Sequence, residues 1–174
     1  MTPGTLVLLH GPLDTVAAWG QLPETLRSYG LVVVAPDVRG EDGMRYVARA
    51  ALIIAASAPK APLVLVGHGA AGPLLPSIAA AQRAAHRSVG AYVFVDAQLP
   101  MVLRAPQTPD HGHGHQRVQE VPVPEDWPDA PCGYLHLSTA YDQEARQARL
   151  RGWPVTSPEQ ADLPQALHQL IITL

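Results

Sequence analysis

The chain has 174 residues, of which 47% are hydrophobic and 16% are charged, and its formal net charge is −3. This length and composition suit one folded domain and exclude a disordered chain, which carries more charge and fewer aliphatic side chains. The slightly acidic balance and the absence of a membrane-length apolar stretch predict neither a nucleic-acid partner nor a membrane partner. Cys132 is the single cysteine, and no basic residue precedes the first apolar run. The sequence therefore predicts a cytoplasmic protein without an intrachain disulfide.

Short aliphatic runs alternate with segments of helical spacing along the chain. Continuous apolar runs of this kind are typical of strands that are buried on both faces of a parallel sheet. We predict strands at residues 5–9 (TLVLL), 31–35 (LVVVA), 63–66 (LVLV), 91–95 (AYVFV) and, from a weaker pattern, 134–138 (YLHLS).

Between these runs, apolar residues recur at the spacing of one helix face. The four sets are Trp19, Leu22, Leu26 and Tyr29; Met44, Val47, Ala51 and Ile54; Leu74, Leu75, Ile78, Ala79 and Ala85; and Leu163, Leu167, Leu170 and Ile171. Asp42 is placed to cap the second of these helices. The alternation of strands and helices predicts a three-layer α/β/α fold with five or six mostly parallel strands.

Residues 100–132 interrupt this alternation with several prolines and a run of alternating histidine and glycine, His111–His115. We interpret the segment as an irregular loop within a single domain that spans residues 1–174. Histidines at alternate positions can converge on one metal ion, with Asp110 as a further ligand. No cysteine or glutamate nearby completes such a set, so the sequence favours a solvated loop and predicts no metal and no cofactor.

The apolar run at 63–66 leads into Gly67-His68-Gly69-Ala70-Ala71-Gly72 and then into a helical segment. One interpretation is the dinucleotide fingerprint G-x-G-x-x-G, with Asp96 at the end of the next strand as the ribose-binding acid. A pyrophosphate needs free backbone N–H groups at the start of the helix, and Pro73 and Pro76 each remove one. The other interpretation is a nucleophile elbow, the sharp turn between a strand and a helix that presents a catalytic side chain.

Four further motifs favour the elbow. They are Leu8-Leu9-His10-Gly11 with Trp19 behind it, Pro36-Asp37-Val38-Arg39-Gly40, Val95-Asp96, and Tyr141-Asp142. In this order, and over most of its length, the chain resembles the α/β-hydrolase superfamily, and residues 129–155 are similar to the C-terminal part of its small esterase-like members. The resemblance implies an α/β-hydrolase fold and the hydrolysis of esters or related bonds.

The resemblance also implies a triad of serine, histidine and acid, with Asp142 in the position of the acid. The position of the serine is Gly69, which supplies no oxygen or sulfur to form an acyl-enzyme. The loop at 153–163, where the family's histidine is expected, contains none, and His168 lies off the apolar face of the last helix. Relatives with a substrate-covering cap also carry more residues between Asp96 and Asp129. The sequence therefore predicts that acyl-enzyme chemistry is absent.

The oxyanion loop departs from the family's pattern as well. The residue after His10-Gly11 is Pro12, which has no N–H to donate, unless a shift of one residue lets Leu13 supply the donor. Loss of one such donor typically costs about 2.7–4 kcal/mol of transition-state stabilisation. We nevertheless expect a small-molecule crevice at the carboxyl ends of the strands. Its predicted lining is His10, Gly11, Pro12, Leu13, Trp19, Gly69 and Ala70.

Three functions remain open from the sequence. The first is a small-molecule-binding or accessory protein that is not an active serine hydrolase. The second is an enzyme with non-covalent chemistry (a lyase, a cyclase or a proton-transfer catalyst) that uses His68, His10 or Asp142. For His68, a packed histidine that supports the turn is the preferred interpretation, because a base also needs a reacting partner within reach. The third is dinucleotide binding through the three glycines.

Overall fold

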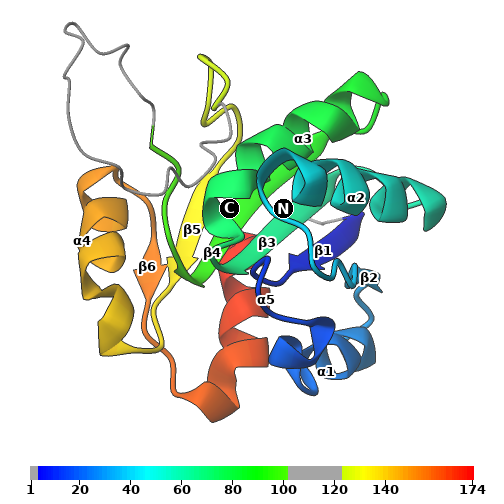
Figure 1. Ribbon diagram of the computed structural model, residues 1–174. Helices are drawn as coiled ribbons and strands as arrows, with labels where there is room; N and C mark the ends of the chain where they lie inside the picture. Colours follow the sequence, from blue (N-terminus) through cyan, green and yellow to red (C-terminus); the bar gives the residue numbers. More distant parts are fainter. Residues whose placement is uncertain (1–3, 102–122) are drawn as a thin grey trace, which may run out of the picture.

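The structure is a computed structural model that describes residues 4–101 and 123–174 (Figure 1). Four short 3₁₀ turns, η1 to η4, accompany its helices and strands. The elements are, in chain order, β1 (Thr5–Leu9), η1 (Val16–Trp19), α1 (Leu22–Ser28), β2 (Val33–Val34), α2 (Gly43–Ala56), β3 (Leu63–Gly69), η2 (Gly72–Leu74), α3 (Leu75–Ala84), β4 (Val89–Ala97), β5 (Cys132–Leu135), η3 (Thr139–Tyr141), α4 (Asp142–Leu150), β6 (Val155–Thr156), η4 (Gln160–Asp162) and α5 (Leu163–Thr173).

The strands form one six-stranded sheet in the order β2-β1-β3-β4-β5-β6. Every pair of neighbouring strands is parallel. The predicted three-layer fold with a parallel sheet is therefore confirmed. Because all strands run the same way, their carboxyl ends lie at one edge of the sheet, where chain-distant loops meet.

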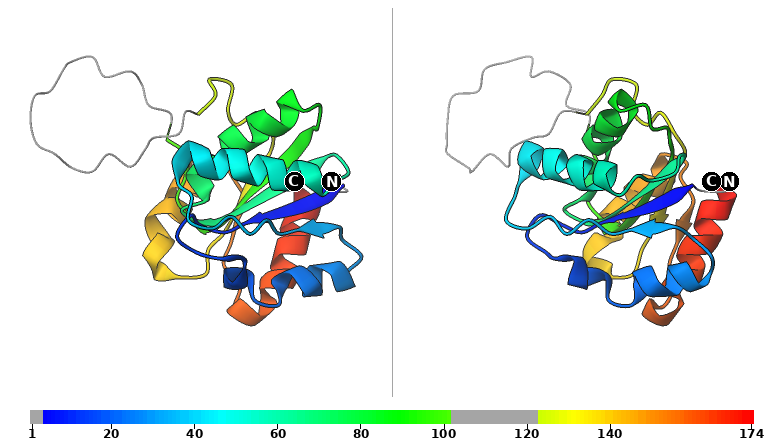
Figure 2. Two further views of the ribbon diagram at one scale, coloured as in Figure 1. Left: turned by 45° about the vertical axis from the view of Figure 1, so that its right-hand side comes forward. Right: turned by 90° about the vertical axis from the view of Figure 1, so that its right-hand side faces the viewer.

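Helices cover both faces of the sheet, as Figure 2 shows. Helices α2, α3 and α4 pack on one face, and α1 and α5 pack on the other. Alternate residues of each strand enter the two cores: in β4, for example, Tyr92 and Phe94 face the first, and Val93 and Val95 face the second. The central strands carry continuous apolar runs because both faces are covered, and their polar residues, such as His68 and Asp96, lie near the carboxyl ends.

The helix faces differ in part from those predicted. In α2 the buried residues are Tyr46, Val47, Ala50 and Ile54, whereas Met44 is 52% exposed. Asp42 does precede this helix, but its carboxylate makes no capping hydrogen bond.

Helix α4 was not predicted. Only Ala145 and Ala148 of its nine residues are buried, so its sequence carries almost no apolar periodicity. The histidines at 111–115, and with them the question of a metal there, lie outside the described residues.

Candidate functional site

The turn after β3 keeps the backbone of a nucleophile elbow. Gly69 ends the strand with φ of +58°, in the left-handed region that a side chain adopts only with strain. The Gly69 carbonyl accepts a hydrogen bond from the Gln98 N–H at 3.1 Å, which ties the turn to the loop after β4. A Cβ at Gly69 would contact only the Tyr141 hydroxyl, at 3.7 Å, so there is room for a side chain here. The elbow is thus formed without the hydroxyl that it normally presents.

The Tyr141 hydroxyl is the nearest group to the Cβ position of Gly69, at 3.7 Å. Sequence reasoning used Tyr141 only as part of a motif and missed this position. Burial raises the pKa of Tyr141, and the nearby carboxylates of Asp96, Glu144 and Asp14 raise it further. The phenol therefore stays protonated at neutral pH, where it donates hydrogen bonds but is a poor nucleophile.

The oxyanion loop carries a carboxylate of its own. A Cβ at Gly11 would lie 2.8 Å from Asp14 Oδ2 and 3.5 Å from the Ala70 backbone nitrogen. The Asp14 N–H donates to the Gly11 carbonyl at 2.9 Å, which closes a tight turn around Pro12. A negative charge beside the Ala70 amide opposes a developing oxyanion. Leu13, the predicted substitute donor, has a fully exposed side chain.

His10 is a structural residue of this loop rather than a free base. Its ring is completely buried, and its Nδ1 lies 2.8 Å from the Gly11 carbonyl. Its Nε2 accepts the Val38 N–H at 3.1 Å, and the Tyr46 hydroxyl donates to the His10 carbonyl. Because Nε2 accepts, the proton of the neutral ring is on Nδ1, and neither nitrogen is left to act on a substrate.

His68 and Trp19 lie next to each other with unpaired ring nitrogens. Their ring centroids are 5.6 Å apart in an edge-to-face arrangement. Trp19 Nε1 and His68 Nδ1 are both buried and have no hydrogen-bond partner within the described part of the chain. Buried polar groups normally have a hydrogen-bond partner, so these two nitrogens are unusual within the described residues.

Asp142 has a histidine neighbour that the sequence analysis did not find. Its Oδ1 lies 2.9 Å from Nε2 of His136, the residue that directly follows β5. The contact does not have hydrogen-bond geometry, and it is an ion pair only when the imidazole is protonated on both nitrogens. The sequence analysis placed His136 only within the weaker strand run at residues 134–138. Only the turn at 138–141, which brings Asp142 back over the end of β5, reveals the pair.

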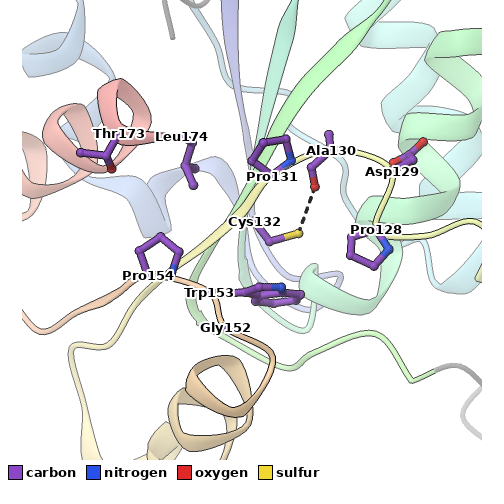
Figure 3. A pocket seen from close by; sticks show the side chains of 10 residues that line it. All are labelled: Pro128, Asp129, Ala130, Pro131, Cys132, Gly152, Trp153, Pro154, Thr173 and Leu174. Carbon is purple, nitrogen blue, oxygen red and sulfur yellow. Dashed lines mark hydrogen bonds between the residues drawn. The ribbon is translucent and has the colours of Figure 1, made fainter.

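Two open pockets accompany the sheet, and they lie at opposite edges. The first, of about 540 Å³, is at the amino end of β5 between residues 128–132, 152–154 and the end of α5, far from the elbow (Figure 3). Cys132 lines this pocket, and its thiol donates a hydrogen bond to the Ala130 carbonyl at 3.6 Å. Burial raises the pKa of the thiol to about 12. Its sulfur is therefore protonated and unreactive at neutral pH.

The second pocket, of about 340 Å³, lies between η1, α1 and the start of α5. Trp19 lines it, and is the one predicted binding residue that lines either pocket. Both η1 and α5 follow loops from the carboxyl edge of the sheet, so this pocket is on the side of the elbow. Its volume is in the range of small-molecule sites. We name it the Trp19 pocket.

Over the residues that the structure describes, no helix has the length and apolar character needed to cross a bilayer. The same residues contain no group of three or more histidine, cysteine, aspartate or glutamate side chains placed to hold a metal ion.

A parallel sheet with a left-handed turn between its central strand and the next helix is the architecture of the α/β hydrolases. Residues 6–173 match the sequence model of the Alpha/beta hydrolase family, and the chain belongs to this family. No curated protein matches the chain closely enough to be counted as a relative.

Solved structures show the same fold at low identity. An extracellular α/β-hydrolase from a Paenibacillus species, described as sharing homology with tobacco salicylic acid binding protein 2, is 14% identical, with 98% of each chain covered and a TM-score of 0.67. The pyrethroid hydrolase PytH is 17% identical in one structure, with 99% of this chain and 97% of that chain covered and a TM-score of 0.67. An arylesterase is 14% identical, with 91% and 67% covered and a TM-score of 0.59. At these identities the likeness concerns the fold alone.

Proposed function

We propose that this α/β-hydrolase-fold protein binds a small molecule with an acceptor oxygen in the Trp19 pocket and forms no acyl-enzyme at its elbow. The observation that carries the proposal is the pair of unpaired ring nitrogens, Trp19 Nε1 and His68 Nδ1, beside an elbow whose central residue is Gly69. The first feature supports binding, and the second removes the nucleophile on which the family's chemistry depends.

The surroundings of Gly69 support binding without acyl transfer. The Tyr141 phenol borders the Cβ position of Gly69, at 3.7 Å, and burial and nearby carboxylates raise its pKa. Asp14 places a carboxylate at the oxyanion loop. In a hydrolase this loop stabilises the negative charge that develops on the substrate, which a carboxylate would repel. Pro12 contributes no donor to that loop. Each feature acts against the tetrahedral intermediate of ester hydrolysis.

A second candidate is an enzyme with non-covalent chemistry. His68 favours it, because its Nδ1 is free to accept or donate a proton, depending on the tautomer. His10 cannot share this role, since both of its ring nitrogens are engaged. Dinucleotide binding has the least support. Pro73 lies in η2 and Pro76 in the first turn of α3, where a pyrophosphate needs backbone donors.

Ligand-observed NMR with p-nitrophenyl acetate tests the proposal. We choose an aryl ester because the similar structures include an arylesterase and a pyrethroid hydrolase. The measurement uses the Ser157→Ala protein, which lacks a surface serine beside His136. We expect saturation transfer from this protein to an ester that stays intact. Trp19→Phe keeps an aromatic side chain but removes the indole N–H, so the affinity should fall at least about 2- to 12-fold, as for one neutral hydrogen bond.

Trp153→Phe is the matched control, since Trp153 lines the pocket at the opposite edge of the sheet. It should leave the affinity unchanged. Absence of saturation transfer, or an equal loss in both variants, contradicts binding in the Trp19 pocket. Consumption of the ester at a rate that depends on His68 favours the second candidate instead.

A further inference from the structure

A serine, a histidine and an aspartate meet at the end of β5, outside the elbow. His136 stands between the other two: its Nε2 is 2.9 Å from Asp142 Oδ1, and its Nδ1 is 3.4 Å from Ser157 Oγ. Ser157 directly follows β6, and Asp142 begins α4. Three separate segments of the chain thus bring together the three side-chain types of a nucleophilic triad.

The backbone holds the histidine in this place from two sides. The His136 N–H donates to the Thr156 carbonyl at 2.9 Å, which fixes the end of β5 beside the residue that precedes Ser157. On the other side, the Leu137 N–H donates to Asp96 Oδ1 at 2.7 Å. Asp96 is 6% exposed and has φ of +39°, so a strained, buried carboxylate anchors the segment.

The three side chains differ in their exposure to solvent. The His136 side chain is 16% exposed and that of Asp142 is 56% exposed, whereas Ser157 is on the surface. A reagent therefore reaches the serine from solvent, while the imidazole behind it is largely shielded from water.

The order of the contacts gives the imidazole the role of a base. A neutral ring whose proton is on Nε2, toward the Asp142 carboxylate, keeps its lone pair on Nδ1, toward the Ser157 hydroxyl. The Nε2–H is not aligned with the carboxylate in the structure, so the ring has to turn before this hydrogen bond forms. The carboxylate then stabilises the imidazolium that forms when the serine proton is taken up.

We propose that Ser157 is a nucleophile, activated by His136 and with Asp142 as a positioning residue, that accepts the acyl group of an activated ester. As the bond from Oγ to the acyl carbon forms, the Oγ–H bond breaks and its proton passes to His136 Nδ1. The bond from the acyl carbon to the alkoxide or phenoxide then breaks, and the leaving oxygen takes that proton. This site goes beyond the proposed function, because it shares no residue with the Trp19 pocket.

The test is labelling of the intact chain with a fluorophosphonate, which reacts with activated serines with loss of fluoride. We expect one adduct, mapped by peptide mass spectrometry to Ser157, and none in Ser157→Ala. His136→Gln should slow labelling about 100-fold, as for loss of a general base. Ser138→Ala removes an exposed serine from the loop after β5, which also carries His136. This variant should be labelled at the wild-type rate.

The role of Asp142 is tested by the labelling rates of two further variants. Asp142→Asn should slow labelling at least about tenfold, and Asp142→Glu, which keeps the charge, should recover part of the rate. Because the Asp142 side chain is mostly exposed, we expect its variants to fold. Their labelling rates can therefore be compared with the wild-type rate even if His136→Gln does not fold. The proposal is overturned if Ser157 carries no adduct, or if the adduct forms equally fast in His136→Gln and Asp142→Asn. None of these outcomes bears on ligand binding in the Trp19 pocket.

Discussion

Gly72→Ala is expected to remove about 3 kcal/mol or more from the free energy of unfolding, and to leave little folded protein. A Cβ at this position would lie 1.9 Å from the Gln98 carbonyl oxygen and 3.1 Å from its carbon. The clash is with backbone, and Gln98 is itself held to the elbow by its N–H on the Gly69 carbonyl. Neither side can move away without opening the contact between the ends of β3 and β4.

Gly69→Ala is the matched control for this prediction. Its Cβ would meet nothing closer than the Tyr141 hydroxyl at 3.7 Å, so the cost is that of a positive φ alone, about 1–2 kcal/mol. Urea denaturation followed by circular dichroism measures both. Equal losses in the two variants would show that the packing around Gly72 is not as tight as described. The predicted difference means that packing requires glycine at position 72 but not at position 69, so the missing nucleophile is not imposed by the fold.

His10→Ala should cost about 3 kcal/mol, the second large effect that we expect. The substitution leaves a cavity in a fully buried site and strips the Val38 N–H of its acceptor. His68→Ala should cost about 1 kcal/mol or less, because this ring is partly exposed and its Nδ1 makes no hydrogen bond with the described residues. Thermal unfolding of the two variants provides the measurement.

A larger loss for His68→Ala than for His10→Ala would reverse the roles assigned to the two histidines. The expected order separates them by function. His10 holds the loop after β1 against the segment around Val38, whereas His68 Nδ1 makes no hydrogen bond with the described residues that could be lost.

The sheet could be predicted from the sequence because burial on both faces makes each central strand a continuous apolar run. β2 and β5 were placed less well. β2 has only two paired residues, Val33–Val34, and β5 begins at Cys132, ahead of the predicted run. Helix α4 was not predicted because only two of its residues, Ala145 and Ala148, are buried against the sheet. Its charged remainder gives no periodic signal.

The left-handed turn at Gly69 agrees with the elbow that the sequence favoured, although the same glycines also match a dinucleotide fingerprint, so the elbow stays an interpretation. The contacts of Tyr141 with the elbow and of His136 with Asp142 could not be predicted, because they depend on how the loops after β5 fold back over the sheet. The unpaired nitrogens of Trp19 and His68 are likewise a product of packing. The single-domain organisation, the cytoplasmic location and the roles of the predicted site residues stay predictions.

The central claim is that no acyl-enzyme forms over Gly69. Its most direct test is incubation of the Ser157→Ala variant with p-nitrophenyl acetate. The rate of phenolate release is measured, and the peptides that contain His68 and Tyr141 are examined for acetylation by mass spectrometry. The serine is removed so that the result does not depend on the site at β5. We predict phenolate release at the rate of buffer alone and no acetyl group on either peptide. Acetylation of Tyr141 or His68, or release that disappears in Tyr141→Phe, would contradict the claim.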